Sequence, residues 1–285
     1  MPEELGASTL TTRPSARAGI LIHLQVHASV VTEEIVENGH PKHVKRVIVV
    51  LNDITRMKNL ERVRRDFVAN VSHELKTPIT SIKGFTETLL EGALEDTETS
   101  RSFISIIRQQ SERLVAIIED LLSLSRLEQQ ESEIEREETA VAGIVHSAVQ
   151  VCKAQSDEKE TAIVNKCTED CRVYGNNLLI EQAMVNLIDN AVKYSPRSSE
   201  VVVQCSEEVN GTYLSVRDNG PGIPQKDLSR IFERFYRVDK TRSRELGGTG
   251  LGLAIVKHIA ISHGGEVTVE SSEGEGTTFY MFFPP

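Results

Sequence analysis

Apolar and polar positions alternate along residues 20–30, where Ile, Leu, Val and Ala side chains are separated by His, Gln and Ser. A period of two is typical of a half-buried β-strand. The turn signal Asn38-Gly39 and the apolar run 47–51 predict a second strand. Residues 1–17, rich in Ser, Thr and Pro, are expected to be irregular. His23 and His27 share the polar face of the first strand; a solvated surface is the simpler reading, and zinc binding or pH sensing stays open.

Residues 55–130 carry a helical pattern in two long segments. In the second segment, apolar side chains recur every four and three residues from Phe103 to Leu124, and Gln110 is the one polar position in this seam. A similar stripe runs from Leu60 to Leu89 in the first segment. The pattern predicts two long helices, each with one apolar face.

The helical pattern breaks at residues 92–96, which predicts a hairpin turn with Asp96 or Thr97 as the N-cap of the second helix. Two helices cannot bury both apolar stripes by themselves. Two hairpins that form a four-helix bundle can bury them, so we expect a homodimer.

After an acidic linker at 129–138, helical and strand patterns alternate to the end of the chain. Mixed strands and helices of this kind predict an α/β sandwich. Helices are expected at 141–155, 177–194 and 251–263, and strands at 201–207, 212–218, 266–271 and 277–283.

Composition narrows the class of protein. The chain has 285 residues, a length typical of two domains, and 39% hydrophobic with 26% charged residues is ordinary for a globular protein. Lys and Arg number 32 against 42 Asp and Glu, so the net charge is −10. This balance argues against a nucleic-acid partner, which requires a basic face. An anionic ligand must therefore be held by a local site.

No stretch of about 18 apolar residues is present, so we expect no membrane segment in this chain, and its start lacks the apolar region of a secretory signal. These features predict a cytoplasmic location, either free or as the inner part of a longer receptor. The four cysteines are too few for a disulfide framework. Cys167 and Cys171 leave half of a metal site open, and reduced structural thiols are the simpler reading.

Residues 67–80 contain the first candidate chemistry. His73 lies two residues from the seam positions Val71 and Leu75, so at 100° per residue it points away from both and is solvent-accessible. Thr77 follows one turn later on nearly the same face, and Pro78 is expected to bend the helix beside the histidine. Such a histidine is either a plain surface residue or a nucleophile.

Residues 177–194 contain a second candidate. Asn186, Asn190 and Lys193 recur at four and three residues on a face away from the apolar stripe. Carboxamide oxygens are hard ligands that suit Mg²⁺, and a lysine can meet a phosphate as a point charge. The alternative is a hydrated helix face.

Two glycine clusters complete the candidate site. The cluster 218–222 ends a strand, where Asp218 could accept a hydrogen bond from an exocyclic amine while the glycines admit a flat ring. The cluster 247–253 opens a helix, whose free N–H groups can bind phosphate. Between them lies a basic stretch that is either a solvated loop or a cationic lid over a polyphosphate, consisting of Arg234, Arg237, Lys240, Arg242 and Arg244.

Neither glycine cluster is a Walker loop or the glycine-rich loop of eukaryotic-type protein kinases. The order of motifs instead resembles the sensor histidine kinases of two-component systems, and most closely the phosphate-regulon type. The run His73-Glu74-Leu75-Lys76-Thr77-Pro78 is similar to their H box. Residues 186–194, 218–222, 232–235 and 248–252 are similar to their N, G1, F and G2 boxes, and 274–277 to the last glycine box.

This resemblance implies ATP and Mg²⁺ as ligands and assigns roles to residues. It makes His73 the phosphate-accepting nucleophile, Glu74 the group that polarises its ring, and Thr77 the residue that orients water for dephosphorylation of the partner. It assigns Mg²⁺ to Asn190, the adenine amino group to Asp218 and phosphates to Lys193 and Arg234. The nucleotide-binding positions it implies are Asn186, Asn190, Lys193, Tyr194, Asp218, Gly220, Gly222, Arg234, Gly248, Thr249, Gly250, Leu251, Gly252 and Thr277.

The implied organisation has three parts. Residues 1–54 resemble the end of a PAS sensor domain, 55–130 form the dimerisation and phosphotransfer hairpin, and 131–285 form a catalytic domain of the GHKL ATPase (Bergerat) type. The implied partner is the receiver domain of a response regulator, and the linker is a hinge. A membrane receptor or a phosphate-transport complex could recruit the chain. Two alternatives stay open: a phosphatase-only or scaffold dimer, and an ATP-driven clamp of the gyrase and chaperone kind.

Overall fold

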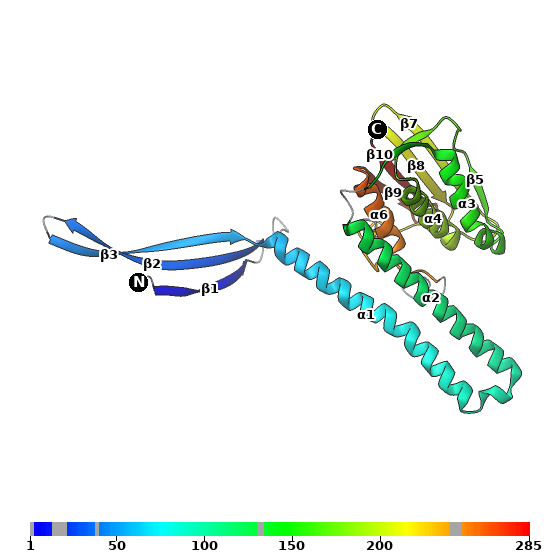
Figure 1. Cartoon of the computed structure of the whole chain (residues 1–285), viewed down its shortest axis with the longest axis horizontal. Helices are drawn as coiled ribbons and strands as arrows, with labels where there is room; N and C mark the ends of the chain where they lie inside the picture. Colours follow the sequence, from blue (N-terminus) through cyan, green and yellow to red (C-terminus); the bar gives the residue numbers. More distant parts are fainter. Residues whose placement is uncertain (1–2, 13–21, 38–39, 130–133, 240–246) are drawn as a thin grey trace. The chain divides into compact units, whose positions relative to one another are not determined.

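The computed structural model describes residues 3–12, 22–37, 40–129, 134–239 and 247–285 (Figure 1). The chain divides into two compact units, Met1–His73 and Glu74–Pro285, and the boundary falls inside one helix, α1 (Thr55–Leu90). Among the described residues, no helix combines the length and the apolar character needed to cross a membrane.

The first unit contains a three-stranded antiparallel sheet of β1 (Glu3–Thr12), β2 (Ile22–Glu37) and β3 (His40–Asp53), in that order. The expectation of an irregular start is therefore wrong for β1, because backbone pairing with β2 forms a strand where composition alone suggests a loop. The two predicted strands are present and longer than expected. Asp53 accepts a hydrogen bond from the backbone N–H of Thr55, where α1 begins. The similarity of this sheet to a PAS domain stays a prediction.

The predicted hairpin is confirmed. The helix α1 is followed by a short 3-10 helix, η1 (Ala93–Glu95), and by α2 (Thr97–Gln129). Asp96 caps α2, because its carboxylate accepts hydrogen bonds from the backbone N–H of Glu98 at 3.0 Å and from the hydroxyl of Thr99 at 2.5 Å.

The apolar surface of α2 extends beyond the seam of the hairpin. Within the second unit, Phe85 of α1 lies against Phe103 of α2, with ring centroids 5.1 Å apart. Ile117 and Leu124 of α2 are almost fully buried. Val115 and Leu122 of α2, which lie outside the predicted seam, are each 53% exposed. The apolar surface of α2 is thus larger than one chain covers.

The C-terminal part of the second unit is the predicted α/β sandwich. A five-stranded sheet has the order β5-β7-β8-β10-β9, in which only the β5–β7 pair is parallel. Its strands are β5 (Ala162–Asn165), β7 (Glu200–Glu208), β8 (Gly211–Asp218), β9 (Glu266–Ser272) and β10 (Gly276–Phe283). The short strands β4 (Glu137–Ala140) and β6 (Arg172–Gly175) pair separately.

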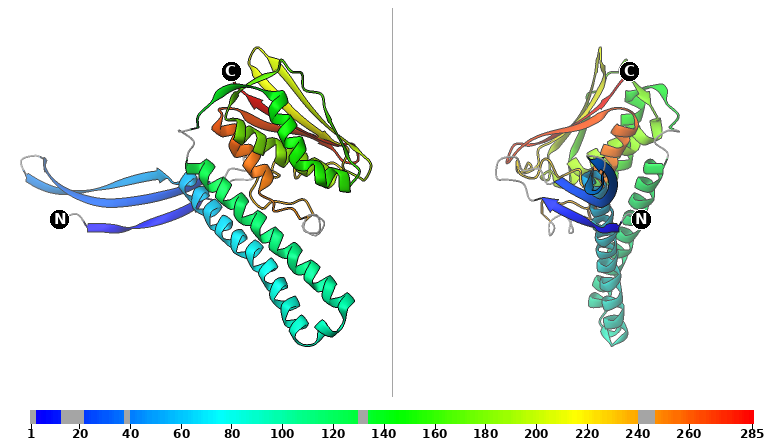
Figure 2. Two further views of the ribbon diagram at one scale, coloured as in Figure 1. Left: turned by 45° about the vertical axis from the view of Figure 1, so that its right-hand side comes forward. Right: turned by 90° about the vertical axis from the view of Figure 1, so that its left-hand side faces the viewer.

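Three helices cover one face of this sheet: α3 (Val141–Glu158), α4 (Asn177–Tyr194) and α6 (Gly252–Ser262) (Figures 1 and 2). The core lies between the two layers. Alternate residues of the strands, such as Leu214 and Val216 on β8, are fully buried against apolar helix residues such as Leu187 on α4. Polar residues of α4, among them Asn186 and Asn190, line a cavity together with Asp218 at the end of β8.

Candidate functional site

A cavity of about 520 Å³ is bounded by α4, the end of β8, the glycine-rich segment before α6 and one face of α2. Most residues that the sequence predicted for nucleotide binding line this single cavity. They are Asn186, Asn190, Lys193, Tyr194, Asp218, Gly222, Gly248, Thr249, Gly250, Gly252 and Thr277.

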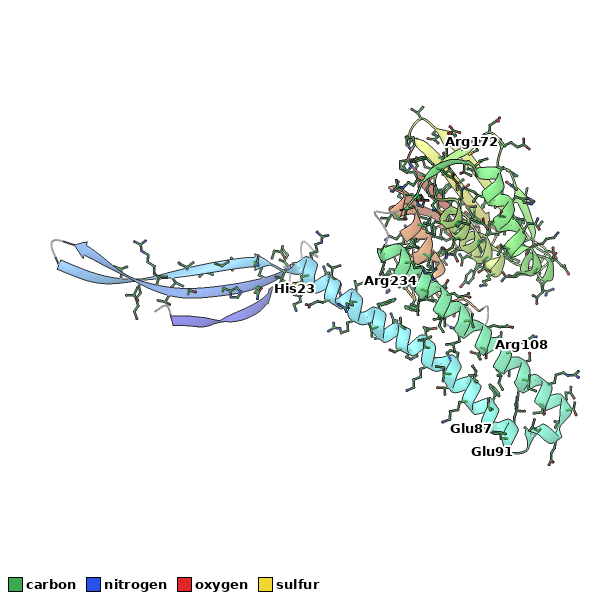
Figure 3. The ribbon with its side chains drawn as sticks, in the orientation of Figure 1. His23, Glu87, Glu91, Arg108, Arg172 and Arg234 are labelled. Atoms are coloured by element: carbon green, nitrogen blue, oxygen red, sulfur yellow. The ribbon has the colours of Figure 1, made fainter. Side chains whose placement is uncertain are left out.

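Three predicted site residues do not line the cavity. Gly220 donates its backbone N–H to Asp218, and Leu251 is fully buried with its N–H directed to the hydroxyl of Thr249. Both therefore support residues that do line the cavity. The guanidinium of Arg234, which is labelled in Figure 3, instead forms an ion pair with Glu128 near the end of α2. Its Nη2 lies 3.4 Å from Nε2 of His258. Its proposed contact with phosphate stays a prediction.

Asp218 is the buried acid of the site, with only 4% of its surface exposed. Its Oδ1 accepts hydrogen bonds from the backbone N–H of Gly220 at 2.7 Å and of Thr277 at 3.2 Å. Burial raises the pKa of Asp218 to about 6, although these two bonds oppose the shift. The carboxylate thus borders the cavity in a fixed orientation and can accept a further donor.

The surroundings of Asp218 suit a flat ring. The apolar side chains of Ile223, Ile231 and Phe279 line the same cavity. Gly222 has a φ of 73°, and a Cβ at this position would collide with the carbonyl oxygen of Ser272. Only glycine allows the chain to pass so close to β9, so an open path to Asp218 depends on it.

The polar face of α4 carries oxygen and cationic groups into the cavity. Lys193 pairs with Asp189 at 2.7 Å, one turn earlier on the helix. Asn186 and Asn190 present carboxamides, which are hard donors that fit Mg²⁺. Among the described residues, no group of three His, Cys, Asp or Glu side chains could hold a metal ion alone.

The helix α2 contributes a carboxylate that no sequence pattern indicated. The hydroxyl of Thr249 donates to Asp120 Oδ2 at 2.6 Å, and Asp120 also lines the cavity. Burial raises the pKa of Asp120, while the bond from Thr249 opposes the shift. Asp120 lies on the polar flank of a predicted seam, so the sequence gives only its place on a helix and not the loop it contacts.

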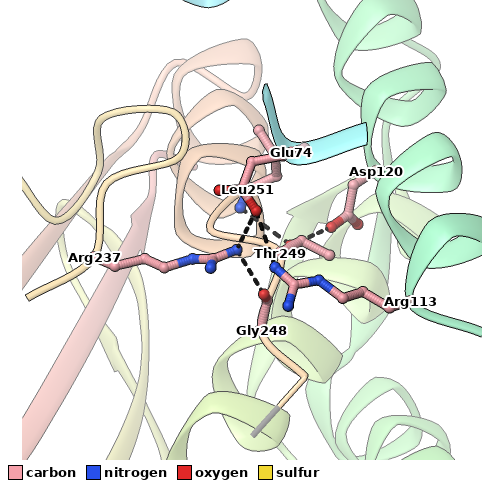
Figure 4. A network of polar contacts seen from close by, with 7 residues as sticks. All are labelled: Glu74, Arg113, Asp120, Arg237, Gly248, Thr249 and Leu251. Atoms are coloured by element: carbon pink, nitrogen blue, oxygen red, sulfur yellow. Dashed lines mark hydrogen bonds and ion pairs between the residues drawn. The ribbon is translucent and has the colours of Figure 1, made fainter. Parts of the chain in front are cut away.

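A second contact between α2 and the glycine-rich segment centres on Glu74 (Figure 4). Glu74 Oε2 lies 2.9 Å from Nη2 of Arg113 and 3.3 Å from Nη2 of Arg237. Arg237 also donates to the carbonyl oxygen of Gly248 at 2.7 Å. The sequence grouped Arg237 with a basic stretch, whose members Lys240, Arg242 and Arg244 lie outside the described residues.

The histidine of the predicted H box lies in the middle of α1. The side chain of His73 is exposed, whereas Val71 and Leu75 on either side are half-buried, as the helical pattern predicted. Thr77 is half-buried and Pro78 is buried. The helix continues through Pro78.

An exposed histidine lies on a hairpin helix, and an α/β sandwich follows in which the asparagine helix and the glycine segments share one cavity. This arrangement defines a class of protein in which a phospho-acceptor hairpin precedes an ATPase-like domain. Family models agree with this class. Residues 63–130 match the His Kinase A (phospho-acceptor) domain, and residues 175–285 match the histidine kinase-, DNA gyrase B-, and HSP90-like ATPase.

The chain belongs to the sensor histidine kinases, and the curated relatives that it matches are described as sensor or sensor-like histidine kinases. It is 38% identical over 263 residues to the sensor histidine kinase WalK of Bacillus subtilis, covering 92% of this chain and 42% of WalK. It is 40% identical over 237 residues to the sensor-like histidine kinase SenX3 of Mycolicibacterium smegmatis, covering 83% of this chain and 62% of SenX3. The chain thus spans less than two thirds of either relative.

Solved structures of histidine kinases share the fold. The kinase AdeS of Acinetobacter baumannii superposes with a TM-score of 0.59 and 27% identity, over 74% of this chain and 97% of that one. Full-length ShkA, solved in complex with AMPPNP, superposes with a TM-score of 0.55 and 25% identity, over 77% of this chain and 46% of that one. The histidine kinase ThkA, solved in complex with the response regulator TrrA, superposes with a TM-score of 0.63 and 21% identity, over 97% of this chain and 78% of that one.

Proposed function

We propose that this chain is an ATP-dependent protein-histidine kinase that phosphorylates His73 and passes the phosphoryl group to an aspartate in the receiver domain of a response regulator. One observation carries the proposal above all others. Side chains from three separate sequence motifs, at 186–194, 218–222 and 248–252, meet in one cavity of a unit that also contains the H-box residue Glu74.

The proposed ligand is ATP with Mg²⁺. Asp218 accepts a hydrogen bond from the adenine amino group, and the nearby apolar side chains pack against the ring. Lys193 and the backbone of the glycine-rich segment bind phosphates, and Asn190 binds the cation. When bound, Mg²⁺ supplies charge neutralisation to the phosphates. The AMPPNP complex of ShkA supports a nucleoside triphosphate at this fold.

The proposed reaction is a phosphoryl transfer between ATP and an imidazole. A ring nitrogen of His73 uses its lone pair to form a bond to the γ-phosphorus, while the bond from that phosphorus to the bridging oxygen breaks and its electron pair leaves with ADP. Glu74 accepts the hydrogen bond of the other ring N–H, which makes the attacking nitrogen more basic. The protein's contribution is alignment and charge neutralisation.

We further propose that the kinase acts as a homodimer in the cytoplasm, where ATP and receiver domains are available. The apolar side chains of α2 that one chain leaves exposed support a bundle of two hairpins. The ThkA–TrrA complex supports a receiver domain as the partner. We propose the boundaries 1–54, 55–130 and 131–285 for the sensor-like, hairpin and catalytic parts.

Dephosphorylation of the regulator, with Thr77 orienting the water, is proposed as a second activity of the same hairpin.

Incubation with γ-labelled ATP tests this function. The purified chain is expected to take up label that is labile in acid and stable in alkali, because a phosphorus–nitrogen bond hydrolyses when its nitrogen is protonated. Addition of receiver domains from the same host is expected to move the label to one of them, as an acyl phosphate that alkali and hydroxylamine cleave. A chain that binds ATP but takes up no label would favour the scaffold alternative.

Asn190→Asp is expected to impair the use of Mg-ATP while the dimer persists. The change replaces a neutral ligand with a charge beside Lys193, Asp189 and the phosphates, so the balance of charge at the cation is altered. We expect autophosphorylation to fall at least about tenfold. The rate should be measured across a range of Mg²⁺ concentrations, with Asn165→Asp as control, because the exposed Asn165 on β5 uses its side-chain oxygen to accept from the N–H of Cys167. Turnover equal to that of the native chain would contradict the assignment of the metal.

A further inference from the structure

Arg113 is a buried cation that lies outside all of the sequence motifs. It lies on α2 with 8% of its side chain exposed, and its Nη2 is 2.9 Å from Glu74 Oε2. Within the described part of the chain, its Nε is buried and has no hydrogen-bond partner. Removal of a guanidinium from water costs folding free energy, which a single ion pair does not necessarily recover. This cost suggests a role for Arg113 beyond stability.

Arg237 reaches the same carboxylate oxygen from the opposite side (Figure 4). Its side chain is 4% exposed, and its Nη2 divides between Glu74 Oε2 at 3.3 Å and the carbonyl of Gly248 at 2.7 Å. Two buried guanidinium groups thus contact one carboxylate oxygen.

The two arginines differ in what else they can reach. Arg237 lines the nucleotide cavity and shares its donor with the glycine-rich segment, so an incoming phosphate can draw it away from Glu74. Arg113 is not among the cavity residues, and its contact with Glu74 is the shorter of the two. The pair with Arg113 can therefore persist when Arg237 turns to the nucleotide.

We propose that Arg113 is a positioning residue of the phosphotransfer reaction. It holds the Glu74 carboxylate in place while Arg237 exchanges that carboxylate for the phosphates of ATP. This role rests on the proposed function, because it acts through Glu74 on the histidine that precedes it along α1. The charge and reach of Arg113, and not only its volume, are required.

Arg113→Met and Arg113→Lys test the proposal. In Arg113→Met, kcat for autophosphorylation is expected to fall about ten- to a hundredfold. Without Arg113 the Glu74 carboxylate can shift, and a small shift of a group that orients the nucleophile slows the transfer. KM for ATP is expected to stay within about twofold, since Arg113 does not line the cavity. Arg113→Lys is expected to recover part of the lost kcat. Arg108→Met, which removes an exposed arginine on the same helix, is the control and should match the native chain.

A double-mutant cycle with Glu74→Gln shows whether Arg113 acts through Glu74. Single-turnover labelling over hours measures slow residual rates. If the role is correct, Arg113→Met slows the native chain and adds little to Glu74→Gln, because their effects are not additive. Equal fold-losses in both backgrounds would overturn it. If Glu74→Gln shows no residual rate, Arg113→Lys is compared with Arg113→Met instead. Equal kcat values for these two variants, in dimers of equal thermal stability, would also overturn the proposed role of Arg113.

The failure of this inference is distinguishable from failure of the proposed function. If the native chain takes up no label at His73, the function itself is wrong. If the native chain is labelled and Arg113→Met keeps its kcat, only the role of Arg113 is wrong.

Discussion

The His73→Gln variant is expected to take up no acid-labile label from γ-labelled ATP, a loss of at least about three orders of magnitude in the rate of autophosphorylation. An amide nitrogen delocalises its lone pair into the carbonyl and is not a nucleophile, whereas a neutral imidazole nitrogen is one. The side chain at this position is exposed, so glutamine is accommodated without a change in packing. The variant should therefore keep its thermal stability and its affinity for ATP.

The measurement compares label uptake and ATP binding in one preparation. Lys83→Gln, which changes an exposed residue of the same helix outside the H box, is the matched control and should be labelled. Full labelling of His73→Gln would exclude this histidine as the acceptor. Loss of ATP binding together with the label would show that the variant is misfolded, and His73→Asn would then replace it.

Periodicity along the sequence predicted the elements that form the core of the second unit. The helix predicted at 177–194 is observed with those bounds, because a wide apolar stripe and an N-cap at Asn176 both mark its start. The strands β4, β5 and β6 were missed, since four residues are too few for a readable alternation. The strand β1 was missed because its formation depends on pairing with β2 and not on its own composition.

The motifs that carry the candidate site were predicted for a related reason. Glycines and asparagines at fixed spacing mark where the backbone must turn and which helix face is polar, so they can be recognised before folding. The contacts of α2, in contrast, could not be recognised from the sequence. Arg234 and Thr249 can each bind a phosphate or a carboxylate, and only the three-dimensional placement shows that Glu128 and Asp120 are their partners here. Arg113 likewise appears in the sequence only as a polar residue of a helix, and its contact with Glu74 is known only from the structure.

Asp218→Asn is expected to weaken ATP binding about ten- to a hundredfold while the fold is kept or stabilised. The carboxylate is the acceptor assigned to the adenine amino group, and hydrogen bonds to charged groups contribute about 1.5–3 kcal/mol. Asparagine retains an oxygen that can accept from the N–H groups of Gly220 and Thr277. The loss should therefore appear in the affinity for nucleotide and not in the structure.

The effect on stability follows from the pKa of Asp218, which burial raises from the ordinary value of 3.8 to about 6. The folded chain therefore binds this proton more tightly than the unfolded chain does. The stabilising contribution is complete below pH ~4 and is lost as the pH rises through about 6. At pH 7 the buried charge costs the fold on the order of 2–3 kcal/mol, from a shift of roughly two units at about 1.4 kcal/mol each. Asp218→Asn removes this cost, so its thermal midpoint at pH 7 is expected to equal or exceed that of the native chain.

The same pKa predicts how nucleotide affinity depends on pH. Below about pH 6 the carboxyl of Asp218 is protonated and a poorer acceptor, so the native chain should lose affinity there, whereas Asp218→Asn should lack this component. Calorimetric titration with ATP between pH 5 and 8 measures both, because the difference between the two chains cancels the ionisation of the nucleotide itself. Asp227→Asn, a change to a buried acid that does not line the cavity, is the control. Parallel pH profiles for the native chain and Asp218→Asn would show that another group receives the base, and the apolar wall of Ile231 and Phe279 would then have to hold adenine without a charged acceptor.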